Sequence, residues 1–379
     1  MSTDPTRTAI GTWSGGRFMH FGQQLDDERF LNLITPDASI PTVLTADVYG
    51  SGEADTWLAR ALDNSELTRD QICVVGAVGH DFYEGEREGA KGFPRFTDPR
   101  LRGPDQYMDY LRAATERSLE RCGIDQFDLL LLHNPDRIGY TSETVWDGMQ
   151  ALKDASLARN IGVAPGPANG FTLDLIDCFE RFGDRIDWAM VILNPLEPWP
   201  GELCLHAAAR NDIKIITRVV DYGGLFYDDL TPGAELGSHD HRSFRPAGWI
   251  EAGRARMELM RPIAQAYDLT MIQLACQWNL AQAAVETVVP TLVQETGPQA
   301  RPVEDKRVEL ATLPAEQSLT QDDVDAIRHI GDNTGSMVLK GANPNFEGDE
   351  RPDGWSLDTH LAQVARRWRI DPARDLVKA

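Results

Sequence analysis

The chain has 379 residues, of which 42% are hydrophobic and 25% charged, so it can bury a large core as one big domain or two ordinary ones. Its formal net charge of −22 disfavours nucleic acid and anionic membranes as partners. No apolar run is long enough for a transmembrane helix, and the first residues lack the apolar centre of a secretion signal. Five widely spaced cysteines indicate buried free thiols in a reducing compartment, so we expect a cytoplasmic protein.

Short apolar, β-branched runs alternate with amphipathic segments along most of the chain. Each run is apolar nearly throughout, as expected of parallel strands that are buried on both faces. The predicted strands are a stretch near 10–13 and the runs 41–46, 71–79, 127–133, 159–165, 187–194, 213–220 and 285–291. The predicted helices between and after them cover 26–34, 52–64, 107–123, 142–156, 172–183, 201–212, 269–282, 320–331 and 357–370.

This alternation favours a closed (β/α)8 TIM barrel, because an open doubly wound sheet would usually show a glycine-rich fingerprint after its first strand and none is present. We therefore predict one α/β domain over residues 1–379. The barrel should occupy about 10–315, and a helical extension about 316–379. The polar insert 80–107 follows the third strand and should overhang the mouth at the carboxyl ends of the strands.

Five segments resemble those of one enzyme superfamily, in order and in spacing. They are ADVYGSGEAD (46–55), SLERCGIDQFDLLLLHNPD (118–136), NIGVA (160–164), GGLF (223–226) and IQLACQWNL (272–280). Together they resemble the aldo/keto reductases over roughly residues 10–315. The resemblance implies a barrel whose mouth holds the active site and, in that family, binds NADP(H) in an extended form.

The family's chemistry uses a tyrosine as general acid, a histidine that orients the carbonyl, and a lysine–aspartate pair that lowers the pKa of the tyrosine. The resemblance places Tyr49 and His133 at the first two positions. The aspartate position, however, is Leu44, and the lysine position is Ala77. Half of the tetrad is absent, and it is the half that tunes the acid.

The family's contacts to the nicotinamide are missing as well. Its serine–asparagine pair corresponds to Ala164 and Pro165, its glutamine to Met190, and its stacking aromatic ring to Arg218. We therefore expect no bound cofactor. If NADP(H) does bind, the residues that could hold its 2′-phosphate after the last strand are Arg301, Lys306 and Arg307.

Several polar and aromatic residues should meet at the mouth, where residues of such barrels serve catalysis. Tyr49 and His133 are predicted to shuttle protons, and Arg218 to hold an oxyanion. Alternatively, Arg218 forms only an ion pair with Asp221, His133 only caps its strand, and Asp47 is merely solvated. The predicted substrate-binding residues are Trp13, His20, Asp47, His80, Asp221 and Tyr222. Two histidines in GSHDHR (237–242) lack a third fixed ligand, so no metal site is predicted.

The residues favour a cofactor-independent lyase, dehydratase or isomerase that performs acid–base chemistry beside a carbonyl or hydroxyl group. The substrate should be a small organic compound, and aromatic residues near the mouth hint at an aromatic one. The alternative is an NADP(H)-dependent reductase or dehydrogenase, in which Lys91 of the insert replaces the missing lysine. A second alternative is a non-catalytic regulatory or partner subunit. The sequence leaves open whether the protein forms a homo-oligomer.

Overall fold

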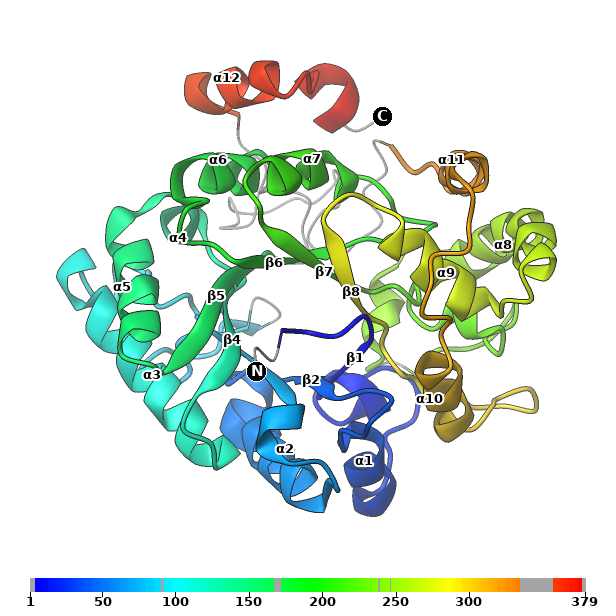
Figure 1. The fold of residues 1–379 in the computed structure, drawn as a ribbon, viewed down its shortest axis with the longest axis horizontal. Helices are drawn as coiled ribbons and strands as arrows, with labels where there is room; N and C mark the ends of the chain where they lie inside the picture. The colour runs from blue at the N-terminus through cyan, green and yellow to red at the C-terminus, as the bar shows by residue number, and fades with distance from the viewer. Residues whose placement is uncertain are drawn as a thin grey trace.

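The computed structural model describes residues 4–89, 92–166, 172–237, 239–245, 247–334 and 357–376. Eight parallel strands are hydrogen-bonded in chain order and form a nearly closed barrel (Figure 1). A parallel bridge between Thr8 and Val288 joins its first and last strands. The predicted (β/α)8 fold is therefore confirmed. The strands are β1 (Ala9–Gly11), β2 (Thr42–Leu44), β3 (Cys73–Val78), β4 (Phe127–His133), β5 (Ala158–Ala164), β6 (Trp188–Ile192), β7 (Lys214–Arg218) and β8 (Val285–Val289).

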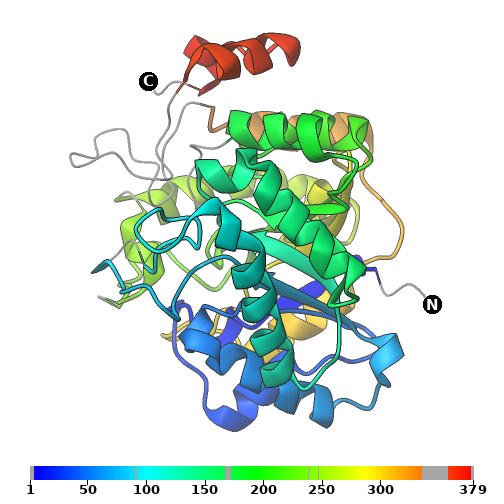
Figure 2. The same ribbon diagram turned by 90° about the vertical axis from the view of Figure 1, so that its left-hand side faces the viewer.

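Helices surround the barrel, and α12 lies outside α6 and α7 (Figures 1 and 2). Side-chain caps define several helix starts, for example Thr270, which accepts the N–H of Gln273 and starts α9. The helices are α1 (Asp27–Ile34), α2 (Glu53–Asn64), α3 (Tyr107–Cys122), α4 (Arg137–Thr141), α5 (Glu143–Asp154), α6 (Thr172–Phe182), α7 (Glu202–Arg210), α8 (Trp249–Ala266), α9 (Met271–Leu280), α10 (Val303–Ala311), α11 (Gln321–Ile330) and α12 (Thr359–Arg367).

The sequence-based prediction missed α4, α8 and α10. The signal for α8 was present, because Met257, Met260 and Ala264 recur at helical spacing and are buried. The signal for α10 was weaker, since it follows a long loop and buries only Val303, Lys306 and Leu310.

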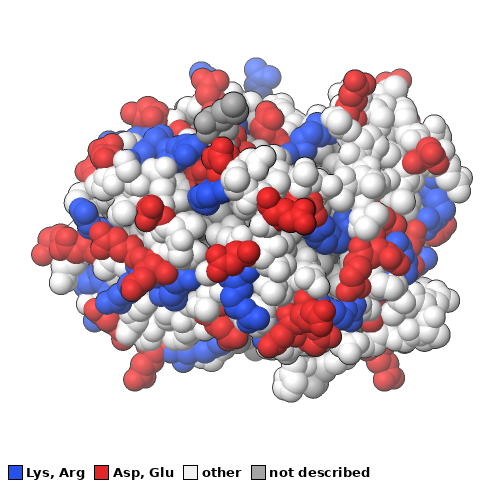
Figure 3. Space-filling model, turned by 60° about the horizontal axis from the view of Figure 1, so that its bottom comes forward, with Lys and Arg blue, Asp and Glu red and all other residues white. Residues whose placement is uncertain are grey.

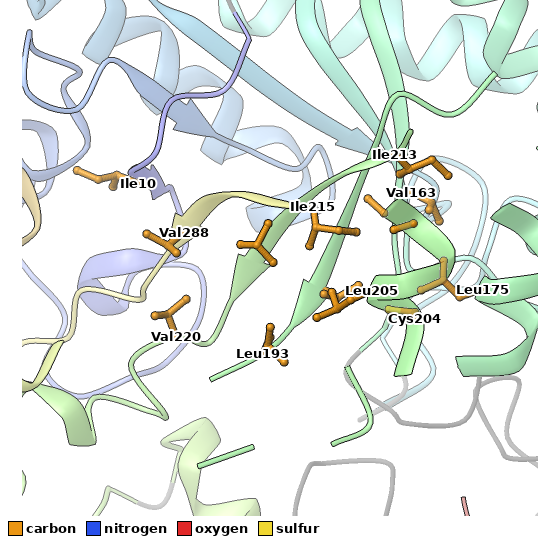
Figure 4. Close-up of a cluster of buried hydrophobic side chains, with 14 of the residues drawn as sticks. Ile10, Val163, Leu175, Leu193, Cys204, Leu205, Ile213, Ile215, Val220 and Val288 are labelled. Atoms are coloured by element: carbon orange, nitrogen blue, oxygen red, sulfur yellow. The ribbon is translucent and has the colours of Figure 1, made fainter. Parts of the chain in front are cut away.

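Apolar side chains form two layers. The larger layer lies between the strands and the helices, where Ile215 and Val163 from the barrel face Leu205 of α7 (Figure 4). The smaller layer fills the barrel itself. Its buried members are Ala9, Trp13, Leu44, Ala46, Cys73, Val75, Ala77, Leu129, Leu131, Ala164, Trp188, Met190, Ile216 and Val289. The interior of the barrel is thus a packed apolar core, and the space for chemistry lies above it, at the ends of the strands.

The two ends of the barrel differ. At the amino ends of the strands, Asp4 pairs with Lys214 at 2.7 Å, and the N–H of Thr6 donates to Oγ1 of Thr42 at 2.9 Å. The amino-terminal segment thus lies across this end, and the loops at the opposite end form the mouth. In the described residues, no helix combines the length and the apolarity that a membrane span requires. All five cysteines are buried and free, as the sequence predicted.

Ion pairs connect many of the loops and helices. On the face shown in Figure 3, acidic and basic side chains are interspersed. One pair is fully buried. Lys306 of α10 lies 2.6 Å from Asp229, which follows the end of β7, and its Nζ also donates to the carbonyl oxygen of Val293 at 2.6 Å. This pair fixes α10 to the loops of the mouth.

Replacing Lys306 by alanine should lower the free energy of unfolding by about 3–5 kcal/mol, because it leaves a buried carboxylate without its cation. Urea denaturation would measure the change. The matched control is Arg112→Ala, which breaks an exposed pair with Glu116 on α3 and should cost less than about 0.5 kcal/mol. Equal losses in the two variants would show that the buried pair does not hold α10.

Candidate active site

Four rings form a row across the carboxyl ends of neighbouring strands. Trp13 follows β1, Tyr49 follows β2, His80 follows β3, and His133 ends β4. The ring centroids of Trp13 and Tyr49 are 6.3 Å apart, those of Tyr49 and His133 5.8 Å, and those of His133 and His80 5.0 Å. Each neighbouring pair meets edge to face. The structure therefore brings together four of the residues that the sequence predicted for the site.

The backbone beside these residues adopts uncommon conformations that aim their side chains. Gly79 has φ of 152°, and a Cβ there would lie 2.7 Å from the carbonyl oxygen of His133, so only glycine fits. Asn134, directly after His133, has φ of 47°, and Val219, directly after Arg218, has φ of 60°. A left-handed conformation is costly for a β-branched residue and is typical of functional sites.

The strand register shows that the positions of the family's missing aspartate and lysine, Leu44 and Ala77, are neighbours in the barrel. Leu44 pairs with Val75 across β2 and β3, and Ala77 lies two residues beyond Val75 on the same face. Both Leu44 and Ala77 are buried in the barrel interior. Burial raises the pKa of Tyr49, and the guanidinium of Arg218 acts in the opposite direction. The phenol is therefore protonated at neutral pH, and the cation that acts on it is an arginine from β7.

His133 is a neutral imidazole at physiological pH. Burial, together with the cations Arg218 and Arg95, lowers its pKa to about 3. Its Nδ1 is buried and has no hydrogen-bond partner among the described residues. Because it is so weak a base, His133 is suited to forming a hydrogen bond to a substrate oxygen, and less suited to the role of base near pH 7 that the sequence suggested.

The insert contributes Arg95, which the sequence analysis missed. An antiparallel bridge joins His80 to Arg95, and Nε of Arg95 donates to the carbonyl oxygen of Asn134. Nδ2 of Asn134 donates to Nε2 of His80 at 3.1 Å, and Nδ1 of His80 lies 3.2 Å from the carbonyl oxygen of Phe93. Burial and Arg95 lower the pKa of His80 well below its usual value. This network places a second cation, Arg95, at the mouth. Its contacts join residues far apart in the sequence, so no local sequence motif indicates them.

Arg218 ends β7 and stands in register with Ile192 of β6 and Val289 of β8. Its Nη2 donates to the carbonyl oxygen of Pro165 at 2.7 Å, whereas its buried Nε has no hydrogen-bond partner among the described residues. The suggested ion pair with Asp221 is not formed. Asp221 instead accepts the N–H groups of Gly224 and Thr291, each at 2.7 Å, and so fastens two loops.

Asp47 is buried and not solvated, contrary to the alternative that the sequence left open. Leu44 and Ala46 point into the barrel, so the alternate residues Thr45 and Asp47 point outward, and Thr45 donates to Asp55 of α2. Neither carboxyl oxygen of Asp47 has a partner among the described side chains. Burial, and next the charge of Asp55, raise the pKa of Asp47 well above its usual value.

Two other predicted substrate-binding residues lie in loop contacts. His20 is exposed and stacks on His241 with ring centroids 5.6 Å apart, which joins the loops that follow β1 and β7. Tyr222 is buried against Trp249, and the guanidinium of Arg245 lies 4.2 Å from the centroid of its ring. These side chains form contacts between the loops around the mouth and are not part of the row of four rings.

The basic residues named for a 2′-phosphate are already paired. Arg301 lies 2.8 Å from Glu309, Lys306 pairs with Asp229, and Arg307 lies 2.7 Å from Asp37. A pocket of about 250 Å³ opens beside Arg301, between α8, α9 and the loop after β7, and Glu309 and Asp228 line it too. Lys91 lies outside the described residues. Within the described parts of the chain, no three His, Cys, Asp or Glu side chains gather as metal ligands would.

The family model, the sequence relatives and the solved structures all point to the same protein family. The family model "Aldo/keto reductase family" matches residues 8–297. An aldo-keto reductase of Mycolicibacterium smegmatis is 35% identical over 143 residues, which cover 33% of this chain and 49% of that relative, about half of its length. The solved glycerol dehydrogenase AKR11B4 of Gluconobacter oxydans aligns with a TM-score of 0.66 and 21% identity over 92% of this chain and 97% of its own. An aldo/keto reductase of Klebsiella pneumoniae, solved with NADP and acetate, has a TM-score of 0.53 and 15% identity over 85% and 90% of the two chains.

Asp47→Asn should stabilise the protein at neutral pH. The folded-state pKa of Asp47 is raised, so the stability it contributes is complete below its unfolded pKa of about 4 and is lost as the pH rises through the folded value. The variant should therefore gain up to about 1.4 kcal/mol per pH unit over wild type above pH 4, until the folded carboxyl ionises. Thermal unfolding at pH 4 to 8 measures this. The control Asp63→Asn, at an exposed position of α2, should show no such trend; a matching trend would contradict the account.

Introducing an aspartate at position 44 and a lysine at position 77 tests whether these two buried positions face one another below the site. Ala77→Lys alone, or Leu44→Asp alone, should destabilise the protein by about 3–5 kcal/mol, because each buries an uncompensated charge. The double variant should recover at least about 1 kcal/mol relative to the sum of the two losses, since the new charges can pair. Urea denaturation of all four proteins gives the coupling energy. Additive losses would show that the two positions do not face one another.

Proposed function

The chain belongs to the aldo/keto reductase family, and from this premise we propose that it is an oxidoreductase that interconverts a carbonyl and a hydroxyl group of a small organic compound, with NADP(H) as its cofactor. The observation that carries the proposal is the Tyr49–His133 pair at the carboxyl end of the barrel, with ring centroids 5.8 Å apart. Support comes from the reductase and dehydrogenase names of the relatives, and from a neighbour in fold that was solved with NADP.

Tyr49 is the proton donor in this proposal. Burial keeps its phenol protonated across the neutral range, so it can transfer the proton to a carbonyl oxygen as negative charge develops there. The phenolate that remains would lie within the field of Arg218, which lowers the cost of forming it. In the reverse direction the same phenolate accepts the proton of an alcohol.

His133 positions the reacting oxygen. Its neutral ring has an N–H group that can donate to the oxygen next to Tyr49, and it carries no charge that would compete with Arg218 for an anion. Arg218 replaces the family's lysine as the cation near the phenol, but it reaches the phenol from β7 and not from β3. The proton-transfer half of the family's reaction is thus retained with a different source of charge.

The residues around the expected cofactor position do not fit the family's usual contacts. Ala164, Pro165 and Met190 offer no polar side-chain atom to the amide of a nicotinamide. A 2′-phosphate beside Arg301 would have to compete with Glu309 for the guanidinium. We therefore assign no residue to a hydride step, and binding of NADPH is the first property to measure.

A second candidate is acid–base chemistry without hydride transfer, such as elimination or isomerisation beside a carbonyl. The specific observation that favours it is the coincidence of apolar Leu44 and Ala77 below the phenol with the missing amide contacts beside it. Tyr49 and His133 would move protons, and Arg218 would stabilise an enolate oxygen. The two candidates use the same residues, Tyr49, His133 and Arg218, and differ in whether a nucleotide takes part.

Titration with NADPH, followed by tryptophan fluorescence, should show micromolar binding, and aldehydes or ketones should then consume NADPH. Tyr49→Phe should lower kcat by about 10²–10⁴-fold without weakening NADPH binding, because general acid catalysis contributes that much. Arg112→Gln, at an exposed position of α3, serves as a control with unchanged kcat. If NADPH fails to bind, and Tyr49-dependent exchange of a ketone's α-hydrogens occurs in D₂O, the second candidate replaces the first.

A further inference from the structure

The mouth of the barrel carries a cation without an acidic counterpart. Among the described residues, no carboxylate pairs with Arg218, whose hydrogen bond goes to the carbonyl oxygen of Pro165. Its Nε is buried and unused. The residue as a whole is half-buried. A guanidinium is charged at any physiological pH, and withdrawing its charge from water is costly unless an anion or hydrogen-bond acceptors compensate it.

Three other arginines at this end of the barrel, each with little exposed side-chain surface, have acidic partners. Arg102 lies 2.5 Å from Asp81, Arg242 lies 2.5 Å from Glu295, and Arg245 lies 3.0 Å from Glu197. In a chain with 59 acidic and 37 basic residues, carboxylates are the more abundant partner. A shortage of acids therefore does not account for the absence of a carboxylate beside Arg218 among the described residues.

The acids closest in sequence to the site do not pair with Arg218. Asp221 is held by two backbone N–H groups, and Asp47, whose carboxyl oxygens have no hydrogen-bond partner among the described residues, points out of the barrel. Asp136, three residues after His133, accepts Oγ1 of Thr97 at 2.8 Å and the N–H of Gly139 at 2.8 Å. Arg95 adds a second positive charge whose field reaches both His80 and His133. The site thus combines a neutral phenol, two neutral imidazoles and the field of two guanidinium groups.

We propose that the substrate is a hydroxy or oxo carboxylic acid, whose carboxylate binds the guanidinium of Arg218 while its hydroxyl or carbonyl oxygen lies between Tyr49 and His133. This inference rests on the proposed function for the second half of that statement. The carboxylate supplies the counterion that the described residues lack, and the guanidinium supplies N–H donors for it. An anion held on this side also places the reacting carbon beside the row of rings.

The geometry favours a carboxylate over a phosphate. Arg218 already uses Nη2 for Pro165, so one edge of a single guanidinium remains, which suits a planar, singly charged group. A phosphate dianion is usually held by several donors, often a nest of backbone N–H groups. The N–H groups of Gly224 and Thr291, which could serve in this way, are occupied by Asp221.

The test compares an acid with its neutral isostere. Lactate and lactamide have nearly the same shape and differ in charge, and their binding to the full chain can be followed by tryptophan fluorescence at fixed ionic strength. Wild type should bind lactate at least 10-fold more tightly than lactamide. In Arg218→Met this ratio should fall to about 1, and Arg218→Lys should lie between, because it keeps the charge and loses the fork. The control Arg112→Gln, which removes an exposed guanidinium on α3, should keep the wild-type ratio.

Folding is checked on the same variants. Arg218→Met should unfold at the same or a higher temperature than wild type, because it removes a half-buried cation that has no acidic partner among the described residues. A wild-type ratio near 1, or a ratio that Arg218→Met leaves unchanged in a folded protein, would overturn the proposal. Tighter binding of inorganic phosphate than of lactate, with the same dependence on Arg218, would overturn it in favour of a phosphorylated ligand.

The outcome is separable from the proposed function. If the ratio depends on Arg218 but no carbonyl acid consumes NADPH, the carboxylate site stands and the oxidoreductase proposal fails. If neutral ketones and their carboxylated analogues are reduced equally well, and Arg218→Met changes both alike, the oxidoreductase proposal stands and the carboxylate site fails.

Discussion

The apolar filling of the barrel is the constraint on which the chemistry of the mouth depends. Leu44, Ala77 and Met190 form part of a floor without charge directly below the site. In such a medium, neutral forms are favoured, which is why burial raises the pKa of Tyr49 and lowers that of His133. Tyr49 and His133 are therefore both neutral at neutral pH, and the positive charge near them comes from arginines.

The same constraint explains why the aspartate and the lysine of the family's tetrad are absent together. Removing one partner of a buried ion pair leaves an uncompensated charge, whereas replacing both by apolar side chains is often neutral or stabilising. Leu44 and Ala77 lie on the same face of neighbouring strands, so a change at one alters what the other can be. Positions 44 and 77 are far apart in the sequence, but in the structure they are neighbours. Their two substitutions therefore form a single change in the apolar interior of the barrel.

Much of this could be predicted from the sequence, and the exceptions have physical causes. Apolar runs marked the strands because both faces of a parallel sheet are buried, and counting along them placed Tyr49, His133 and Arg218 at the strand ends. The outward direction of Asp47 also follows from alternation with Leu44, although the family motif obscured it. The contacts of Asp221 with Thr291 and of Arg95 with Asn134 join residues 70 and 39 positions apart, through loops whose paths no local pattern defines.

Two features of the mouth are energetically unfavourable for folding, and a protein without function at this site would have no reason to keep them. Arg218 is a charged side chain with no acidic partner among the described residues, and Val219, next to it, has a left-handed backbone that typically costs about 1–3 kcal/mol. An apolar side chain at position 218 would remove the first cost, and a glycine at 219 would remove the second. The net charge of −22 does not supply the missing anion, because at physiological ionic strength charges more than about 8 Å away are largely screened. Both costs are accounted for if the guanidinium, aimed by its strained neighbour, binds an anion that arrives with the substrate.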